Sequence, residues 1–164
     1  MFVTSKQSLY CLETQSKILR ILDKTFNELP SFEKSNEVFV IFDRTPVYAK
    51  SGGQKSDEAE VSSDGLSAKV EYAIKKNNIF IHCCTIKEGS ASVGDHVNIK
   101  INKSLRNSHS RAHSCTHLLQ SALREVFGSA VHQKGSKVNE DFLRFDFNFT
   151  DKISREDICR IEKI

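Results

Sequence analysis

The sequence predicts an α+β fold built in two parts. Short apolar runs recur at close spacing between residues 37 and 101 with turn signals between them, a pattern typical of a small antiparallel barrel or sandwich. The character changes near Ser104, after which helical spacing and then strand alternation follow. We therefore expect a β-rich domain over residues 1–104 and an α+β domain, cut short, over residues 105–164.

Each strand of the front half has its own signal. Residues 38–42 form an apolar run, and further strands are expected at residues 68–74, 79–86 and 96–101. Turn signals separate these runs: Thr45-Pro46, Ser51-Gly52-Gly53, Asn77-Asn78 and Gly94-Asp95. Residues 18–26 are ambiguous, because their apolar spacing favours a helix whereas their shortness and β-branched content leave a strand open.

The back half predicts two helices and a strand. Helical spacing runs from residue 108 to residue 127 and stops at Gly128, a residue type that commonly follows a helix. Residues 143–149 alternate apolar and polar side chains, as a half-buried strand does. A second helix is expected from Ser154; its first turn would contain Asp157, and its apolar face Ile158 and Ile161.

Composition narrows the class of protein. No apolar run approaches the roughly 18 residues of a membrane span, so we expect a cytoplasmic protein without a membrane partner. Five cysteines without CxxC spacing indicate free thiols in a reducing compartment. Between Asp95 and Glu125 the charged residues are all basic, an excess that either faces a polyanion such as RNA or is a solvated surface: Lys100, Lys103, Arg106, Arg111 and Arg124.

The most informative stretch is the HxxxH pair of His113 and His117. Residues four apart on a helix lie on one face, so both imidazoles can reach one zinc ion. The alternative is a pair of ordinary histidines. A protease of the HExxH type is excluded, because Ser114 follows His113 where that mechanism needs a glutamate.

Helical geometry places the histidines away from the apolar stripe of their helix. That stripe contains Cys115, Leu118, Leu119, Ala122, Leu123, Val126 and Phe127, so Cys115 is expected to be a core residue rather than a metal ligand. The remaining histidines and cysteines show no complementary ligand spacing, and any further zinc ligands are expected beyond Ile164.

Several motifs resemble the editing region of alanyl-tRNA synthetases. Residues 43–54, Asp-Arg-Thr-Pro-Val-Tyr-Ala-Lys-Ser-Gly-Gly-Gln, resemble the glycine-rich motif of that family, and residues 113–119 resemble its first zinc motif. Residues 133–136 and 143–147 resemble the segments that follow. Order and spacing agree over residues 38–149, whereas residues 1–37 match only loosely.

The resemblance implies a fold and a site. It implies a small antiparallel β-barrel followed by the N-terminal part of an editing fold shared with threonyl-tRNA synthetase, and a barrel strand at residues 18–22. It implies that His113 and His117 are zinc ligands and that Thr116 and Gln133 are the active-site threonine and glutamine. The sequence departs from the family in lacking the CxxxH half of the zinc site and in having Phe149 where a histidine is usual.

The implied activity is hydrolysis of tRNA(Ala) wrongly charged with serine or glycine. A synthetic site discriminates poorly against these amino acids, since one methylene is worth only about 1–3 kcal/mol. Thr116 and Gln133 are expected to position the ester and the attacking water, while zinc either polarises water or anchors the terminal adenosine. ATP and magnesium are expected only in the full ligase, and this chain alone is expected to be weakly active or inactive.

The tRNA acceptor end is the expected partner, with no DNA partner, and the sequence leaves the oligomeric state open. The residues expected to contact tRNA are Arg44, Ser51, Gly52, Gly53, Gln54, Arg111 and Lys134. Two alternatives stay open: a free-standing deacylase that edits the same tRNA in trans, and a non-catalytic tRNA-binding module.

Overall fold

The computed structural model describes residues 6–7, 11–33 and 37–164 of the chain. The chain divides into two compact units. Unit 1 contains residues 1–51 and 56–106, and unit 2 contains residues 52–55 and 107–164. Residues 1–5, 8–10 and 34–36 of the expected front domain lie outside the described residues.

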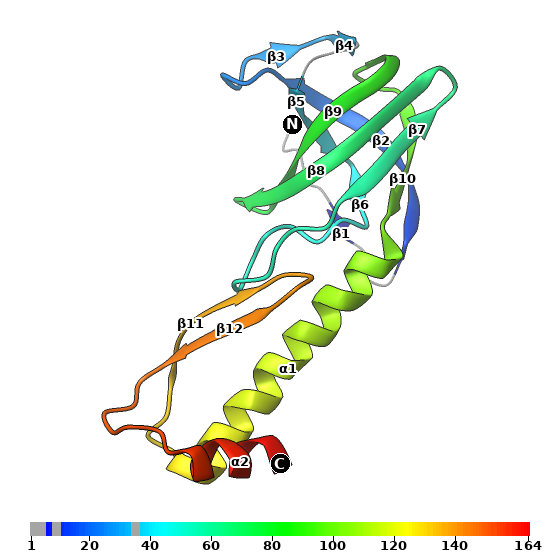
Figure 1. Ribbon diagram of the computed structural model, residues 1–164. Coiled ribbons are helices and arrows are strands. Elements are labelled where there is room, and N and C mark those ends of the chain that lie inside the picture. Colours follow the sequence, from blue (N-terminus) through cyan, green and yellow to red (C-terminus); the bar gives the residue numbers. More distant parts are fainter. Residues whose placement is uncertain (1–5, 8–10, 34–36) are drawn as a thin grey trace. The chain divides into compact units, whose positions relative to one another are not determined.

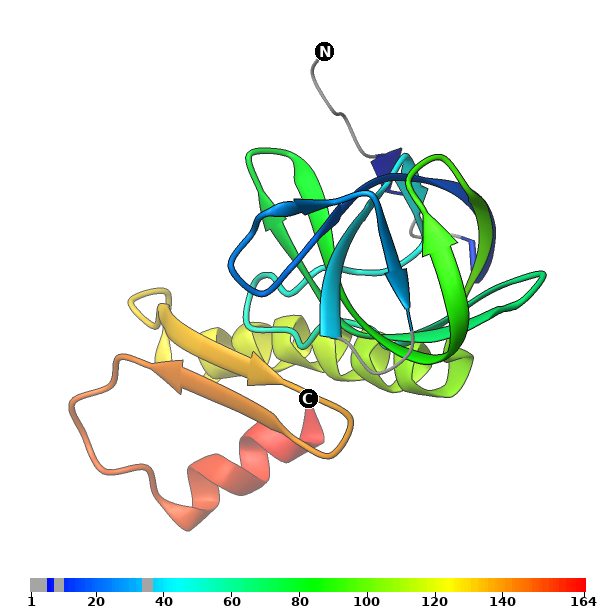
Figure 2. The same cartoon turned by 90° about the horizontal axis from the view of Figure 1, so that it is seen from above.

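Unit 1 is a closed antiparallel β-barrel, as predicted. Its ring runs through β10 (His96–Ile101), β7 (Ala59–Ser63), β8 (Leu66–Lys76), β9 (Ile79–Ser92), β5 (Glu37–Phe42) and β2 (Glu13–Leu22), and β10 pairs with β2 to close it. Figures 1 and 2 show these strands side by side around the barrel. The short strand β3 (Glu28–Leu29) pairs with β2, and β4 (Ser31–Glu33) pairs with β9. A separate pair is formed by β1 (Lys6–Gln7) and β6 (Arg44–Thr45).

The strand implied at residues 18–22 is confirmed, and a β-bulge explains its helical spacing. Ile18 and Ile21 both lie in the barrel core although they are three residues apart. The register of β2 against β5 shifts between Ile18 and Arg20, and the extra residue turns Ile21 back to the interior. Val70 and Ala73 on β8 are both buried next to a similar shift between Val70 and Tyr72.

The predicted turns at Ser51-Gly52-Gly53, Asn77-Asn78 and Gly94-Asp95 form, whereas the one predicted at Thr45-Pro46 does not, because Thr45 belongs to strand β6. Asn77 and Asn78 have φ angles of 49° and 62°, and they join β8 to β9. Two consecutive left-handed residues match the right-handed twist of the strands that they connect, and asparagine tolerates this conformation better than most residues. Gly94, with φ of 102°, takes the corresponding place before β10.

Helix α1 (Lys103–Phe127) begins five residues before the start that its spacing predicts. Asn102 Oδ1 accepts a hydrogen bond from the Leu105 backbone N–H (3.2 Å), which satisfies one of the donors at the helix start. The helix ends at Gly128 as expected. Gly128 has φ of 90°, and its N–H donates to the Arg124 carbonyl (2.9 Å).

The rest of unit 2 is built from a hairpin and a short helix. β11 (Gln133–Val138) pairs with β12 (Leu143–Phe147), and α2 (Arg155–Lys163) follows. α2 begins after Ser154 with Asp157 in its first turn, as predicted, and the two residues form a capping box. Residues 52–55 run beside β11, because Gln54 forms a parallel bridge with Val138.

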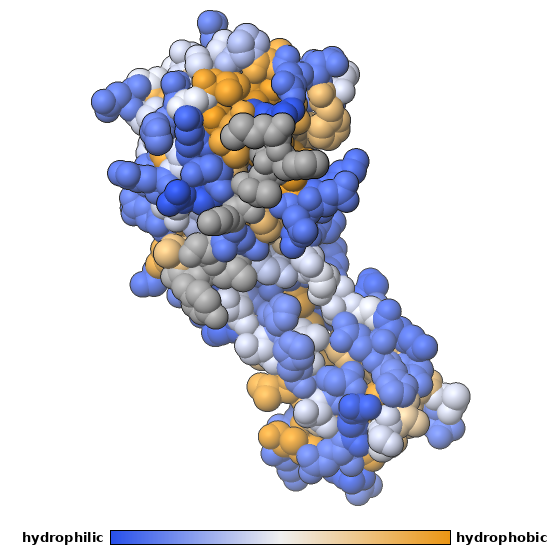
Figure 3. Space-filling view, turned by 180° about the vertical axis from the view of Figure 1, so that it is seen from behind, coloured by the Kyte–Doolittle hydropathy of each residue, from blue (hydrophilic) through white to orange (hydrophobic). Residues whose placement is uncertain are grey.

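The prediction that Cys115 is a core residue is wrong. Cys115 is exposed, and Leu118 on the same stripe of α1 keeps 68% of its surface exposed. Ala122 and Leu123 of the predicted stripe are buried, and His109 and Thr116 are the other buried residues of α1 in unit 2. Periodicity shows which side chains are apolar but not which of them meet a packing partner. Figure 3 shows apolar side chains, in orange, among the hydrophilic surface.

Among the described residues, neither helix combines the length and the apolar character that crossing a membrane requires.

Candidate functional site

His113 and His117 lie one turn apart on α1 with their ring centroids 5.3 Å apart. Two imidazoles bound to one tetrahedral zinc at ordinary Zn–N distances have centroids roughly 5 Å apart. The spacing of the pair therefore fits two of the four ligands of such a site. His113 is half-buried and His117 is exposed.

Gln54 contacts the first of these histidines. Its Oε1 atom lies 2.8 Å from Nδ1 of His113, and Gln54 is 5% exposed. A carbonyl oxygen only accepts hydrogen bonds, so this contact is a hydrogen bond in the tautomer of His113 that has its proton on Nδ1. In that tautomer the other ring nitrogen, Nε2, holds the lone pair that a metal ion needs.

Thr116 lies between the two histidines in the sequence, and its side chain is buried. Its Oγ1 donates to the backbone carbonyl of Ala112 at 3.1 Å. A hydroxyl has one donor and two acceptor lone pairs, so this bond leaves Thr116 only as an acceptor for another group. Such a hydroxyl suits a ligand that brings its own O–H or N–H donor.

Gln133 opens strand β11 and is exposed. Its Nε2 donates to Ser136 Oγ (3.1 Å), and Ser136 Oγ donates to the Gly52 carbonyl (3.4 Å). The strand that contains Gln133 was not expected from periodicity, because residues 133–138 lack an alternating apolar pattern. A polar chain of contacts therefore joins Gln133 to the glycine-rich segment within unit 2.

Gly53 allows residues 52–55 to approach β11 closely. It has φ of 80°, and a Cβ atom at this position would lie 2.3 Å from the Ser136 carbonyl oxygen. Two backbone bonds hold the segment: Val138 N–H donates to the Gly53 carbonyl (2.9 Å), and Lys55 N–H donates to the Val138 carbonyl (3.0 Å). Only glycine combines this backbone conformation with this approach.

A second polar cluster lies one turn before His113. Glu140 Oε1 accepts a hydrogen bond from Lys55 Nζ at 3.0 Å. Its other carboxylate oxygen, Oε2, lies 3.3 Å from Nε2 of the buried His109. The backbone N–H of Glu140, the Lys55 ammonium and the His109 ring lower the pKa of Glu140 to about 2. This carboxylate therefore stays ionised at neutral pH.

The other residues expected to contact tRNA have simpler surroundings. In unit 2, Arg111 is exposed with Nη2 3.1 Å from Ser108 Oγ, and Lys134 is exposed on β11. In unit 1, Arg44 is exposed and pairs with Asp43 at 3.1 Å, and the Ser51 carbonyl accepts the Tyr48 hydroxyl at 3.3 Å.

The structure adds contacts that sequence reasoning missed. Arg106, counted in the basic excess, is buried, and its guanidinium binds the Asp57 carboxylate inside unit 1. His82 is fully buried in the barrel, with Nε2 2.8 Å from Thr45 Oγ1 and Nδ1 3.1 Å from the Val40 carbonyl. Burial lowers the pKa of His82 to about 4. Ion pairing across 49 residues leaves no local signal in the sequence.

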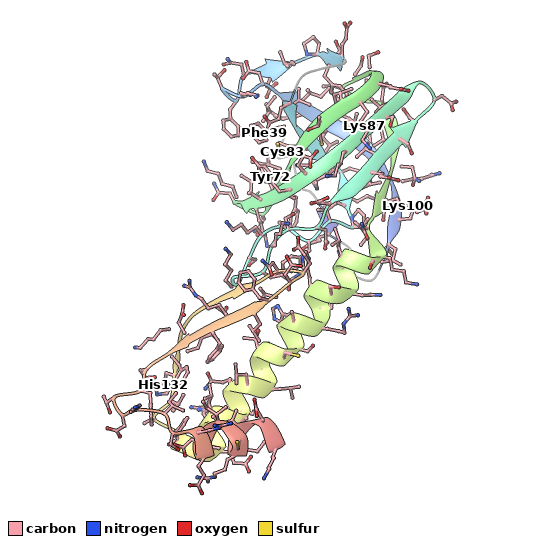
Figure 4. All side chains as sticks on the ribbon, in the orientation of Figure 1. Phe39, Tyr72, Cys83, Lys87, Lys100 and His132 are labelled. Carbon is pink, nitrogen blue, oxygen red and sulfur yellow. The ribbon has the colours of Figure 1, made fainter. Side chains whose placement is uncertain are left out.

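Two further clusters on the barrel lack the chemistry of a reactive site. Tyr72, Cys83 and Phe39 lie on adjacent strands (Figure 4), where burial raises the pKa of the Cys83 thiol to about 11. A pocket of about 360 Å³ is lined by Lys87 and Lys100, both labelled in Figure 4, together with Glu58, Glu60 and Lys69. Lys69 pairs with Glu58 at 2.9 Å, so this lining mixes both charges.

Among the residues that the structure describes, no group of three or more histidine, cysteine, aspartate or glutamate side chains is placed to hold a metal. The HxxxH pair thus supplies two ligands of suitable spacing, and a complete site needs ligands from elsewhere.

Comparisons with known proteins agree with the motifs. The family described as tRNA synthetases class II (A) matches residues 2–105. The chain is 43% identical over 130 residues to an alanine--tRNA ligase of Halorhodospira halophila, covering 79% of this chain and 15% of that protein. It is 41% identical over 132 residues (80% of this chain, 14% of that protein) to an alanine--tRNA ligase of Leptospira biflexa.

A third relative extends the match along the chain. The alanine--tRNA ligase of Thermoanaerobacter sp. is 39% identical over 150 residues, which is 92% of this chain and 17% of that protein. The chain therefore spans less than one fifth of the length of each of these relatives.

Proposed function

Because the chain belongs to the class II (A) family of tRNA synthetases and corresponds to part of an alanyl-tRNA synthetase, we propose that it forms the first half of an editing site. The site hydrolyses the ester of tRNA(Ala) wrongly charged with serine or glycine. The ligase activity of the whole protein, with ATP and magnesium, is part of the same proposal. The observation that supports the editing role is the pairing of His113 and His117 one turn apart on α1, with Gln54 of the glycine-rich segment against His113.

Selection of serine follows from the state of the Thr116 hydroxyl. Its proton is already donated to the Ala112 carbonyl, so its free lone pairs can accept a hydrogen bond from the hydroxyl of the serine ester. Alanine offers no hydroxyl to this acceptor. A site that hydrogen-bonds a substrate hydroxyl rejects an analogue without one far better than an apolar pocket does.

Gln133 orients the ester and the attacking water. Its Nε2 is held by Ser136 Oγ, which leaves the Oε1 atom of the same amide to accept from water. An aminoacyl ester is already reactive, so fixing the water and the carbonyl carbon in place supplies much of the acceleration.

His113 and His117 would hold zinc, together with ligands outside the described residues. Bound zinc supplies a Lewis acid that polarises water or anchors the 3′-terminal adenosine. The contribution of this chain is the Nε2 lone pair of His113, which the Gln54 contact leaves available, and the adjacent imidazole of His117.

Positive side chains provide the contact with the tRNA acceptor end. Arg111 and Lys134 are exposed in unit 2, and Arg44 is exposed in unit 1. Backbone groups of Ser51, Gly52 and Gly53 can approach phosphates because they carry small side chains or none. These contacts bind without reading sequence, as phosphate contacts do.

The test is single-turnover hydrolysis of Ser-tRNA(Ala) by the full protein and its Thr116→Val variant. Valine has nearly the shape of threonine but no acceptor, so we expect hydrolysis of the serine ester to fall about 10²-fold or more with ligation of alanine unchanged. Equal rates of hydrolysis by the two proteins would show that Thr116 does not take part in recognising the serine ester.

A non-catalytic tRNA-binding module is the second candidate. It is favoured by the exposed basic side chains of Arg111 and Lys134, which suit tRNA binding without any catalytic step. If the chain is such a module, the full protein and its Thr116→Val variant both bind tRNA(Ala), and neither hydrolyses the serine ester.

A further inference from the structure

We propose that Gln54 is a positioning residue for His113. Gln54 fixes the ring so that Nδ1 is protonated and the lone pair of Nε2 would be available to a metal ion. This inference rests on the proposed function, because it concerns the imidazole that would bind zinc. It assigns the last residue of the glycine-rich segment a task beyond the phosphate contact expected for that segment.

The contact itself has the geometry of a strong hydrogen bond. The distance from Gln54 Oε1 to His113 Nδ1 is 2.8 Å, and Gln54 is 5% exposed. In water the two tautomers of a histidine differ little in free energy, and a buried acceptor on one nitrogen selects between them. Metal-binding histidines commonly have such a partner, and loss of that partner costs roughly 10- to 100-fold in metal affinity.

Gln54 can perform this task because its backbone is held in place. Gly53 and Lys55 on either side exchange hydrogen bonds with Val138 at 2.9 and 3.0 Å, which forms a single parallel bridge between Gln54 and Val138 of β11. The side chain of Lys55 is tied in turn to Glu140 at 3.0 Å. The amide of Gln54 therefore projects from a fixed backbone rather than from a free loop.

The same segment supports the helix at two successive turns. Gln54 contacts His113, and Lys55 reaches Glu140, whose carboxylate lies 3.3 Å from His109. Since His109 and His113 are four residues apart, they lie on one face of α1. Residues 54 and 55 thus set the orientation of the helix face that carries the first histidine of the pair.

The first measurement is the tautomer of His113 in the wild-type chain without metal. Long-range ¹H–¹⁵N correlation spectra at pH 8 distinguish a protonated Nδ1 from a protonated Nε2 by their nitrogen shifts. We expect Nδ1 to be protonated. A protonated Nε2 with a bare Nδ1 would overturn the inference without any variant.

The second measurement compares variants of the full protein. Gln54→Leu removes the acceptor, and we expect the His113 tautomers to mix and the affinity for Zn²⁺, measured by competition with a chromophoric chelator, to fall about 10- to 100-fold. Gln54→Glu keeps an oxygen acceptor and should retain both the tautomer and the affinity. Gln15→Leu, at an exposed position of β2, is the matched control and should change neither.

The outcomes separate this inference from the proposed function. An unchanged tautomer and Zn²⁺ affinity in Gln54→Leu would overturn the positioning role even if the protein hydrolyses Ser-tRNA(Ala). Conversely, the expected shifts in a protein that leaves the ester intact would support the positioning role and refute the editing function. If Gln54→Leu does not fold, the wild-type spectrum and the Gln54→Glu variant still decide.

Discussion

The carboxylate of Asp57 binds the guanidinium of Arg106 inside the barrel unit. Asp57 Oδ2 accepts from Nε at 3.0 Å and from Nη2 at 2.5 Å, and it also accepts the backbone N–H of Tyr48 at 2.7 Å. Arg106 Nη2 donates further to the Pro46 carbonyl at 2.7 Å. This buried pair fastens the chain just after the glycine-rich segment to the first turn of α1.

Removing the carboxylate should destabilise unit 1. Asp57→Ala leaves the buried Arg106 guanidinium without its partner, and breaking a buried pair in this way costs about 3–5 kcal/mol. Urea unfolding should show the loss, with Asp64→Ala, at an exposed turn position, within about 0.5 kcal/mol of wild type. Similar stabilities for the two variants would mean that the pair contributes little.

Two neighbouring glycines provide a matched pair for the close approach to β11. Gly52 and Gly53 both have positive φ, 57° and 80°, but only at Gly53 would a Cβ atom meet the Ser136 backbone. Gly52→Ala should lower the free energy of unfolding by about 1–2 kcal/mol, because alanine is strained at this positive φ. Gly53→Ala should cost about 2–5 kcal/mol, because steric overlap adds to the same strain. Equal costs in urea unfolding would contradict the approach at Gly53.

The buried His82 should make the stability of the barrel depend on pH. Its pKa in the fold is about 4, below its ordinary value of 6.5, so the unfolded chain binds more protons between these values. Stability is therefore full above pH 6.5 and falls as pH drops toward 4, by about 3 kcal/mol in total.

Comparison with His82→Gln isolates this contribution from those of the other titrating groups. The variant cannot take up the proton, so its free energy of unfolding should fall less between pH 6.5 and 4. Parallel curves for the two proteins would show that His82 titrates normally.

Contact with the phosphate backbone predicts a salt effect. Lys134→Gln should weaken tRNA(Ala) binding and reduce the slope of log affinity against log salt by about one. Lys152→Gln, at an exposed position before α2, serves as a control for general loss of charge. An unchanged slope in Lys134→Gln would remove that residue from the tRNA contact.

Local pattern was enough to predict most of the elements. Strands with clear apolar runs, the turn at Asn77-Asn78 and the capping box at Ser154 are all encoded within a few residues, so they could be predicted from the sequence. The bulge between Ile18 and Arg20 shows where such patterns mislead, because one inserted residue gave a strand the spacing of a helix.

The candidate site depends on contacts that sequence spacing does not encode. The His113–His117 spacing is a local property of α1, whereas the Gln54–His113 bond joins residues 59 positions apart. Strand β11 needs no apolar pattern because backbone bonds hold it, along its length to β12 and at Val138 to residues 53–55. Cys115 is exposed although its place on the apolar stripe predicts a core residue, since the stripe does not show which of its side chains meet a packing partner.

The most direct test of the editing site is hydrolysis of Ser-tRNA(Ala) by the full protein, with zinc content measured on the same samples. His113→Ala should lose zinc and ester hydrolysis together, while His96→Ala, an exposed histidine on β10, should keep both. If His113→Ala hydrolyses the ester at the wild-type rate, or if the wild-type protein contains no zinc and leaves the ester intact, the HxxxH pair is not an editing centre.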